Sequence, residues 1–157
     1  MTPLKDSTVF IAGGDTSLGL AIGRRMVSVG VQRIGVIGID ADLAAGNATT
    51  LFRSASGIWA VADAGDMSSA DDAQRVFTGL SASLGEPDVL VQCSTAGRLL
   101  DLVADDMRAA ESGTIVTIGE GESDEDGGVR WRYVPAGGDD DAVADTVLIA
   151  LQRDRAI

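Results

Sequence analysis

Short apolar runs alternate along the chain with segments in which apolar residues recur every three or four positions. We expect six strands, at 7–12, 33–39, 57–62, 88–93, 114–118 and 129–134. We expect helices between or after them, at 18–29, 41–55, 69–84, 98–111 and 139–153. Continuous apolar strands joined by helices are typical of a parallel sheet covered on both faces. The pattern therefore predicts a doubly wound α/β fold of about six strands, in a single domain over residues 1–157.

Two features of the second half of the chain refine this prediction. The segment 119–128 is acidic and rich in glycine, and we expect it to be an exposed loop. In the strand that follows, polarity alternates, so Trp131 and Tyr133 should face one side of the sheet. Arg130 and Arg132 should face the other side.

The composition excludes several classes of function. The 157 residues carry 12 basic and 24 acidic side chains, a net charge of −12, which argues against nucleic acid or an anionic membrane as partner. The chain has no histidine and one cysteine, Cys93, so Ser-His-Asp and Cys-His catalysis is excluded and Cys93 is expected to be an inert core residue. No apolar run is long enough to span a membrane and no secretory signal is recognisable, so we expect a cytoplasmic protein. The bias toward arginine over lysine favours a bacterial source.

A glycine-containing loop, residues 13–19, connects the first predicted strand to the first helix. Gly13 and Gly19 would allow a tight turn and a close backbone approach, and the helix N-terminus would offer free N–H groups to a pyrophosphate. Asp40 ends the second predicted strand, where an acidic residue would bind a ribose hydroxyl. Asp40 could instead cap the helix that begins at Ala41, and both interpretations stay open.

Further motifs follow in a recognisable order. Ala12 and Ser17 stand where one known family has the threonine and the middle glycine of its glycine loop. Asp66-Met67 follows the third strand, as does that family's aspartate near the adenine, and 94–97 (Ser-Thr-Ala-Gly) stands where it has Asn-Asn-Ala-Gly. In this order and spacing, the motifs resemble the short-chain dehydrogenase/reductase family over most of the chain.

This resemblance implies a Rossmann-like fold that binds a dinucleotide. The residues that it places at the cofactor are Gly13, Thr16, Ser17, Leu18, Gly19, Asp40, Asp66, Met67, Ser94, Ala96 and Gly97. Asp40 implies NAD rather than NADP, because a carboxylate accepts hydrogen bonds from the 2′-hydroxyl and repels a 2′-phosphate. Ser17 narrows the space for the pyrophosphate, although a serine there can cap the helix and donate to phosphate.

The family's catalytic residues are missing from this sequence. The only lysine is Lys5, so the family's Tyr-x-x-x-Lys motif cannot be present, and Glu120 stands where the catalytic serine would be. Tyr133 follows Glu120 at about the family's spacing from serine to tyrosine. A second alignment explains more, because 128–138 resembles the family's sixth strand and the turn after it. In that alignment the chain is a shortened relative without the catalytic helix, and hydride transfer by the family's route should fail.

The absent helix would leave one face of the sheet uncovered near Trp131. Either the shortened fourth helix and Trp131 repack over the gap, or another chain covers it, and we expect a homo-oligomer.

Three functions remain open at this stage. The first is an NAD(H)-binding protein, weakly active or inactive, such as a redox sensor or pseudoenzyme. The second is an active NAD(P)-dependent oxidoreductase with non-standard catalytic groups, in which Tyr133 donates the proton near Glu120. The third is an interaction subunit that has lost the cofactor, suggested by Ser17 and by Ser94 and Thr95 in the family's Asn-Asn positions.

Overall fold

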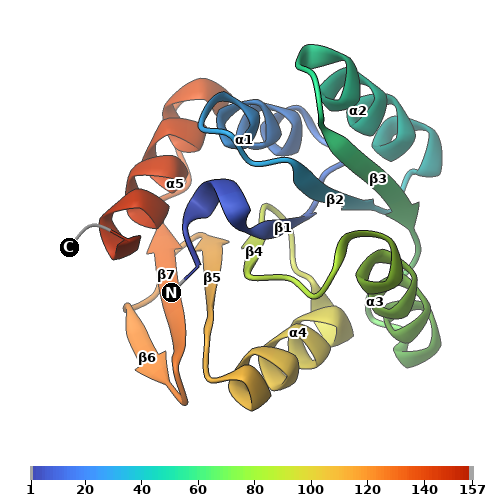
Figure 1. Ribbon diagram of the computed structural model, residues 1–157. Helices are drawn as coiled ribbons and strands as arrows, with labels where there is room; N and C mark the ends of the chain where they lie inside the picture. The colour runs from blue at the N-terminus through green and yellow to red at the C-terminus, as the bar shows by residue number, and fades with distance from the viewer. Residues whose placement is uncertain (1, 156–157) are drawn as a thin grey trace.

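The computed structural model describes residues 2–155 as one sheet between two layers of helices (Figure 1). The strands are β1 (Thr8–Ala12), β2 (Arg33–Gly38), β3 (Trp59–Ala64), β4 (Val89–Gln92), β5 (Gly113–Ile118), β6 (Asp124–Asp126) and β7 (Val129–Val134). The helices are α1 (Ser17–Ser28), α2 (Ala41–Ser54), α3 (Ala70–Leu84), α4 (Gly97–Ala110) and α5 (Asp140–Arg155), and a 3-10 turn, η1 (Leu4–Asp6), precedes β1. The predicted doubly wound, Rossmann-like α/β fold is confirmed.

The strand order places a crevice at a defined point of the sheet. The order is β3-β2-β1-β4-β5-β7-β6, and all neighbours are parallel except β6 and β7. The chain winds outward from β1 to β3 and then returns to place β4 on the other side of β1. Ligands of such sheets bind outside the carboxyl ends of the strands at this reversal. The fold therefore points to the ends of β1 and β4.

Both faces of the sheet are buried, which explains the continuous apolar runs. Helices α1, α2 and α5 cover one face, while α3 and α4 cover the other (Figure 1). In β1, Val9 and Ile11 belong to the first core, and Phe10 and Ala12 belong to the second. Every residue of β1 is buried, so its two faces show no polar alternation.

The segment 119–128 was predicted to be an exposed loop, but it also contains the short strand β6. Gly127 and Gly128 have φ angles of 59° and 86°, and positive φ at both central positions is what a type I′ hairpin turn requires. The turn brings Asp124–Asp126 into antiparallel pairing with the start of β7. The sheet therefore has seven strands rather than about six. The third strand also begins later than predicted, at Trp59 instead of residue 57.

The alternation predicted for β7 is confirmed, and it shows how this end of the sheet is covered on the side of α4. Trp131 packs against the core beneath α4, and the Arg108 guanidinium of α4 lies 5.9 Å from the centre of its ring. Tyr133 is half-buried, and its ring lies so close to Gly121 that a side chain there would collide with it. Residues of α4 and of the segment before β7 thus cover Trp131 and Tyr133 in part. Self-association stays a prediction.

None of the helices within residues 2–155 is long and apolar enough to cross a membrane.

Candidate functional site

A cleft of about 330 Å3 opens at the carboxyl ends of the central strands, where the strand order reverses. Its walls come from the loops that follow β1, β2, β3 and β4. The lining residues are Ala12, Gly13, Asp15, Thr16, Ile37, Gly38, Ile39, Gly65, Asp66, Met67, Ser68, Ser94, Thr95 and Gly97. Six of the eleven residues predicted at the cofactor line this cleft, namely Gly13, Thr16, Asp66, Met67, Ser94 and Gly97.

Glycine is required at both ends of the loop after β1. Gly13 has a φ of 78°, and a Cβ atom there would lie 2.8 Å from the Ser94 Oγ atom. A Cβ atom at Gly19 would lie 2.5 Å from the Gly13 carbonyl oxygen. The two glycines therefore let the loop approach β4 and let α1 approach the loop.

Thr16 caps α1, and the capping role expected of Ser17 is wrong. The Thr16 hydroxyl accepts a hydrogen bond from the Gly19 amide at 3.1 Å and donates to the Gly13 carbonyl at 2.6 Å. The hydrogen bonds of the described chain leave the amides of Ser17 and Leu18 without an acceptor. These amides belong to the first turn of α1, so they are available to an anion.

Asn47 of α2 holds the outer side of the same loop, a role that sequence reasoning missed. Its Nδ2 atom donates to the carbonyl oxygens of Gly14 at 2.7 Å and of Thr16 at 3.2 Å. A neutral donor on a neighbouring helix therefore satisfies both of these carbonyl oxygens.

Asp40 caps α2, and a different acidic residue, Asp15, lines the cleft. The Asp40 Oδ1 atom accepts from the Leu43 amide at 3.0 Å and so caps α2, and Asp40 does not line the cleft. The cleft contains Asp15 instead, whose Oδ2 atom accepts from the amides of Ile39 and Asp40, both at 3.0 Å. Sequence reasoning missed Asp15, because the two amides that it accepts from belong to the end of the next strand along the chain.

The loop after β3 forms the opposite wall. The Asp66 Oδ1 atom accepts from the Ser68 hydroxyl at 2.6 Å and from the Ser68 amide at 2.9 Å, and these hydrogen bonds lower the pKa of Asp66. The Met67 carbonyl accepts from the Arg98 amide at 2.7 Å, which ties this wall to the start of α4. Gly97 allows this contact, because a Cβ atom there would lie 2.5 Å from the Met67 carbonyl oxygen.

Five predicted residues lie outside the lining of the cleft: Ser17, Leu18, Gly19, Asp40 and Ala96. Ala96 is fully buried, and its amide donates to the Gln92 Oε1 atom at 3.1 Å.

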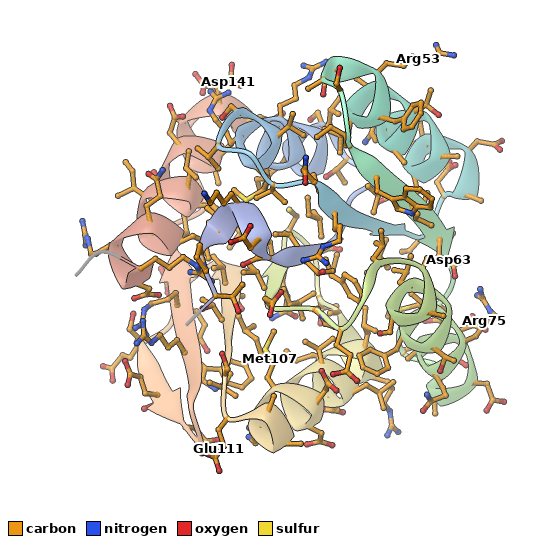
Figure 2. The ribbon with its side chains drawn as sticks, viewed as in Figure 1. Arg53, Asp63, Arg75, Met107, Glu111 and Asp141 are labelled. Carbon is orange, nitrogen blue, oxygen red and sulfur yellow. The ribbon has the colours of Figure 1, made fainter. Side chains whose placement is uncertain are left out.

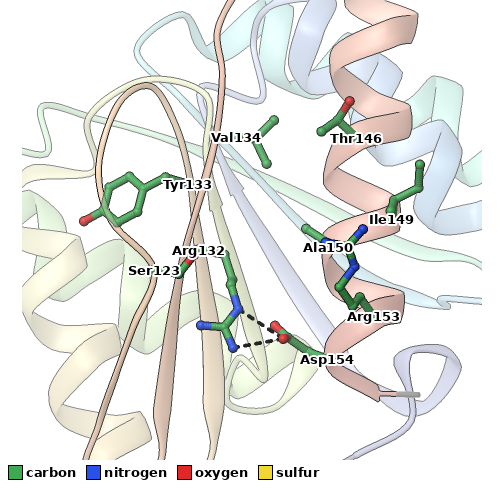
Figure 3. Close-up of a pocket in the computed structure, with 9 residues that line it drawn as sticks. All are labelled: Ser123, Arg132, Tyr133, Val134, Thr146, Ile149, Ala150, Arg153 and Asp154. Atoms are coloured by element: carbon green, nitrogen blue, oxygen red, sulfur yellow. Dashed lines mark hydrogen bonds and ion pairs between the residues drawn. The ribbon is translucent and has the colours of Figure 1, made fainter. Parts of the chain in front are cut away.

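Tyr133 does not line the cleft. It lines a different pocket of about 260 Å3 between β7 and α5, where Figure 3 shows its ring directed to the side opposite Arg132. The strand register places Tyr133 beside Thr117, and Thr117 beside Gln92. The Gln92 Nε2 atom donates to the Thr117 Oγ1 atom at 2.9 Å. These three residues form a polar row across the carboxyl ends of β4, β5 and β7.

The thiol of Cys93 is expected to be unreactive in the native protein. Burial, reinforced by the charge of Asp140, raises the pKa of Cys93 to about 12, so almost no thiolate exists at pH 8. We expect a disulfide reagent to label native Cys93 at least about 100-fold more slowly than the urea-unfolded chain, in which the pKa returns to about 8.5. Equal labelling rates in the two states would contradict this expectation.

Within the described residues, no group of three or more histidine, cysteine, aspartate or glutamate side chains could hold a metal ion.

The comparisons with known proteins give structural matches alone. No family model matches the chain, and no curated protein matches it. A metagenomic short-chain oxidoreductase in complex with NADP matches with a TM-score of 0.77 and 20% identity over 94% of this chain and 91% of its own. A short-chain type dehydrogenase/reductase from Mycobacterium ulcerans matches with a TM-score of 0.64 and 19% identity over 73% of this chain and 51% of its own.

A third match is NAD+-bound xylitol dehydrogenase, with a TM-score of 0.65 and 15% identity over 73% of this chain and 53% of its own. The chain thus spans about half the length of the second and third of these structures. At these identities the likeness establishes the fold. The chain has the Rossmann-like fold of the short-chain dehydrogenase/reductase structures.

Proposed function

We propose that this chain binds a nicotinamide adenine dinucleotide in the cleft at the β1–β4 reversal, with NAD(H) preferred over NADP(H). The observation that carries the proposal is the pair of amides of Ser17 and Leu18, which lack an acceptor at the N-terminus of α1. A helix N-terminus at the reversal of a parallel sheet is the place where such folds hold a pyrophosphate. The matches to one structure with NADP and one with NAD+ support the same ligand class.

The charges around the cleft support the preference for NAD(H). The lining includes two carboxylates, Asp15 and Asp66, and neither arginine nor lysine. Arg75 lies beside the cleft wall near Gly65, but its guanidinium is paired with Asp63 at 2.9 Å and donates to the Ala64 carbonyl at 2.8 Å (Figure 2). Among the lining residues, a 2′-phosphate would therefore meet negative charge and no basic side chain.

We further propose that the bound cofactor is not used for hydride transfer by the family's route, and that the protein acts as a redox sensor or pseudoenzyme. Lys5 is the only lysine of the chain. It lies in η1 beside Gly30, a residue that follows the end of α1. Lys5 is therefore at the amino ends of the strands, whereas the cleft is at their carboxyl ends. No lysine can therefore lower the pKa of a catalytic tyrosine at the cleft.

Titration calorimetry with NAD+, NADH, NADP+ and NADPH tests the proposed ligand. We expect micromolar dissociation constants for the NAD pair and at least tenfold weaker binding of the NADP pair. Lys5→Ala, on the far edge of the sheet, is the matched control and should leave all four values unchanged. The absence of heat and of a thermal shift with all four nucleotides would contradict the proposal and favour an interaction subunit without cofactor.

An active oxidoreductase with non-standard groups is the second candidate, favoured by the row that places Tyr133 beside Thr117 and Gln92. An activity assay over a panel of alcohols and carbonyl compounds, in which NADH absorbance reports turnover, distinguishes the two candidates. If the wild type shows turnover and Tyr133→Phe loses it while still binding NAD+, the protein is an active oxidoreductase and the proposal of a sensor or pseudoenzyme is wrong.

A further inference from the structure

The carboxylate of Asp15, from the loop after β1, accepts hydrogen bonds from the backbone at the end of β2. The Asp15 Oδ2 atom lies 3.0 Å from the amide nitrogens of both Ile39 and Asp40. The side chain is seated against Gly38, where a Cβ atom would lie 2.5 Å from the Asp15 Cβ atom. The absence of a side chain at Gly38 is thus what admits Asp15 to this position.

Two adjacent amides that point to one spot form a small anion-binding site. In this protein the site is filled from within, because one carboxylate oxygen accepts from both amides. A second anion at the same place would have to displace Asp15 or approach it closely. In a sheet of this topology, the adenosine ribose of a dinucleotide lies at the end of the second strand. The filled site is therefore beside the 2′ position.

Asp40 is held in a different role. Its Oδ1 atom caps α2 through the Leu43 amide, and the residue lies outside the lining of the cleft. Asp15 lies within that lining. Of the two carboxylates near the end of β2, Asp15 is the one that a ribose in the cleft would meet.

We propose that Asp15, rather than Asp40, is the specificity-determining residue that excludes a 2′-phosphate from this site. The proposal rests on the proposed binding of a dinucleotide. Asp15 acts in two ways, because its charge repels the phosphate and its oxygen occupies the two amides that could otherwise bind it. The 2′-hydroxyl of NAD carries no charge, so it is not repelled.

The test compares NADP+ with NAD+ in the wild type and in two isosteric variants. Asp15→Asn removes the charge and keeps an oxygen that can accept from the Ile39 and Asp40 amides, and Asp40→Asn is its matched control. We expect Asp15→Asn to lower the ratio of the NADP+ to the NAD+ dissociation constant at least tenfold, mainly through tighter NADP+ binding. Asp40→Asn should change this ratio less than about threefold. An unchanged ratio in Asp15→Asn, or a larger change in Asp40→Asn, would overturn the proposal.

The wild type provides a second measurement that does not depend on the folding of a variant. If Asp15 repels the phosphate, the NADP+ to NAD+ ratio should exceed ten at low salt and should fall as salt screens the charges. Equal affinity for both nucleotides at low salt would overturn the role of Asp15 while leaving dinucleotide binding intact. Failure of the wild type to bind either nucleotide would instead remove the proposed function and this inference with it.

Discussion

A Gly19→Val substitution is expected to abolish dinucleotide binding. The Cβ atom at this position would lie 2.5 Å from the Gly13 carbonyl oxygen and 2.7 Å from the Gly14 Cα atom. Both are backbone atoms, so the clash can be relieved only if α1 moves away from the loop. That movement displaces the amides of Ser17 and Leu18 that face the expected pyrophosphate. We expect the NAD+ dissociation constant to rise at least about 100-fold and the free energy of unfolding to fall by about 2 kcal/mol.

The chain offers a matched control for this substitution. Gly46 lies within α2, and a Cβ atom there would have no atom within 4 Å outside its own stretch of helix. Gly46→Ala should therefore raise the free energy of unfolding by about 0.5–1 kcal/mol and leave NAD+ binding unchanged. Calorimetry and urea denaturation measure both quantities. Wild-type NAD+ affinity in Gly19→Val would show that the loop after β1 is not the binding site.

Loss of the Asp154 carboxylate is expected to destabilise the protein strongly. The Arg132 Nε and Nη2 atoms lie 3.0 and 2.9 Å from the Asp154 Oδ1 atom, and the pair joins β7 to α5 (Figure 3). The exposed fractions of the two side chains are 18% and 10%. In Asp154→Ala, Arg132 would keep only the more distant Glu125 as an ion-pair partner, at 3.4 Å. We expect the free energy of unfolding to fall by about 3 kcal/mol, measured by urea denaturation.

An exposed ion pair serves as the control. Arg25 and Asp145 lie 2.5 Å apart, but their side chains are 29% and 58% exposed. Asp145→Ala should therefore cost less than about 1 kcal/mol, because solvent screens the pair. The double variant Arg132→Met/Asp154→Leu should recover much of the loss, since it leaves no unpaired charge. Equal losses in Asp154→Ala and Asp145→Ala would show that burial of the Arg132 pair does not contribute.

The hairpin of β6 and β7 shows where composition misled the prediction. An acidic, glycine-rich segment normally remains solvated, and 119–128 was expected to do so. Here Gly127 and Gly128 turn the chain back onto itself, and Glu125 of β6 pairs with Arg130 at 3.7 Å and with Arg132 at 3.4 Å. The basic partners of these acids lie only a few residues later in the sequence. The adjacent glycines Gly127 and Gly128 were the signal available in the sequence, because glycine pairs favour two-residue hairpin turns.

The glycine loop of the candidate site could be predicted because its requirements are local. A tight turn between a strand and a helix requires glycine, so the positions of Gly13 and Gly19 could be found from their spacing alone. The assignment of Asp40 depended on the direction of its side chain, and the capping alternative left open for it is the arrangement observed. Asp15 could not be assigned its place, because its two partners, the amides of Ile39 and Asp40, are 24 and 25 residues away.

The sequence by itself determined the class of fold, the order of its main elements and the glycine loop at the end of β1. These features follow from hydrophobic periodicity and from backbone conformations that only certain residues adopt, and both act within a few neighbouring residues. The tertiary structure alone decided which acid faces the cleft, how Arg108 and Trp131 cover the sheet, and that Tyr133 lies beside Thr117. Each of these depends on the distance between segments far apart along the chain, which folding brings together.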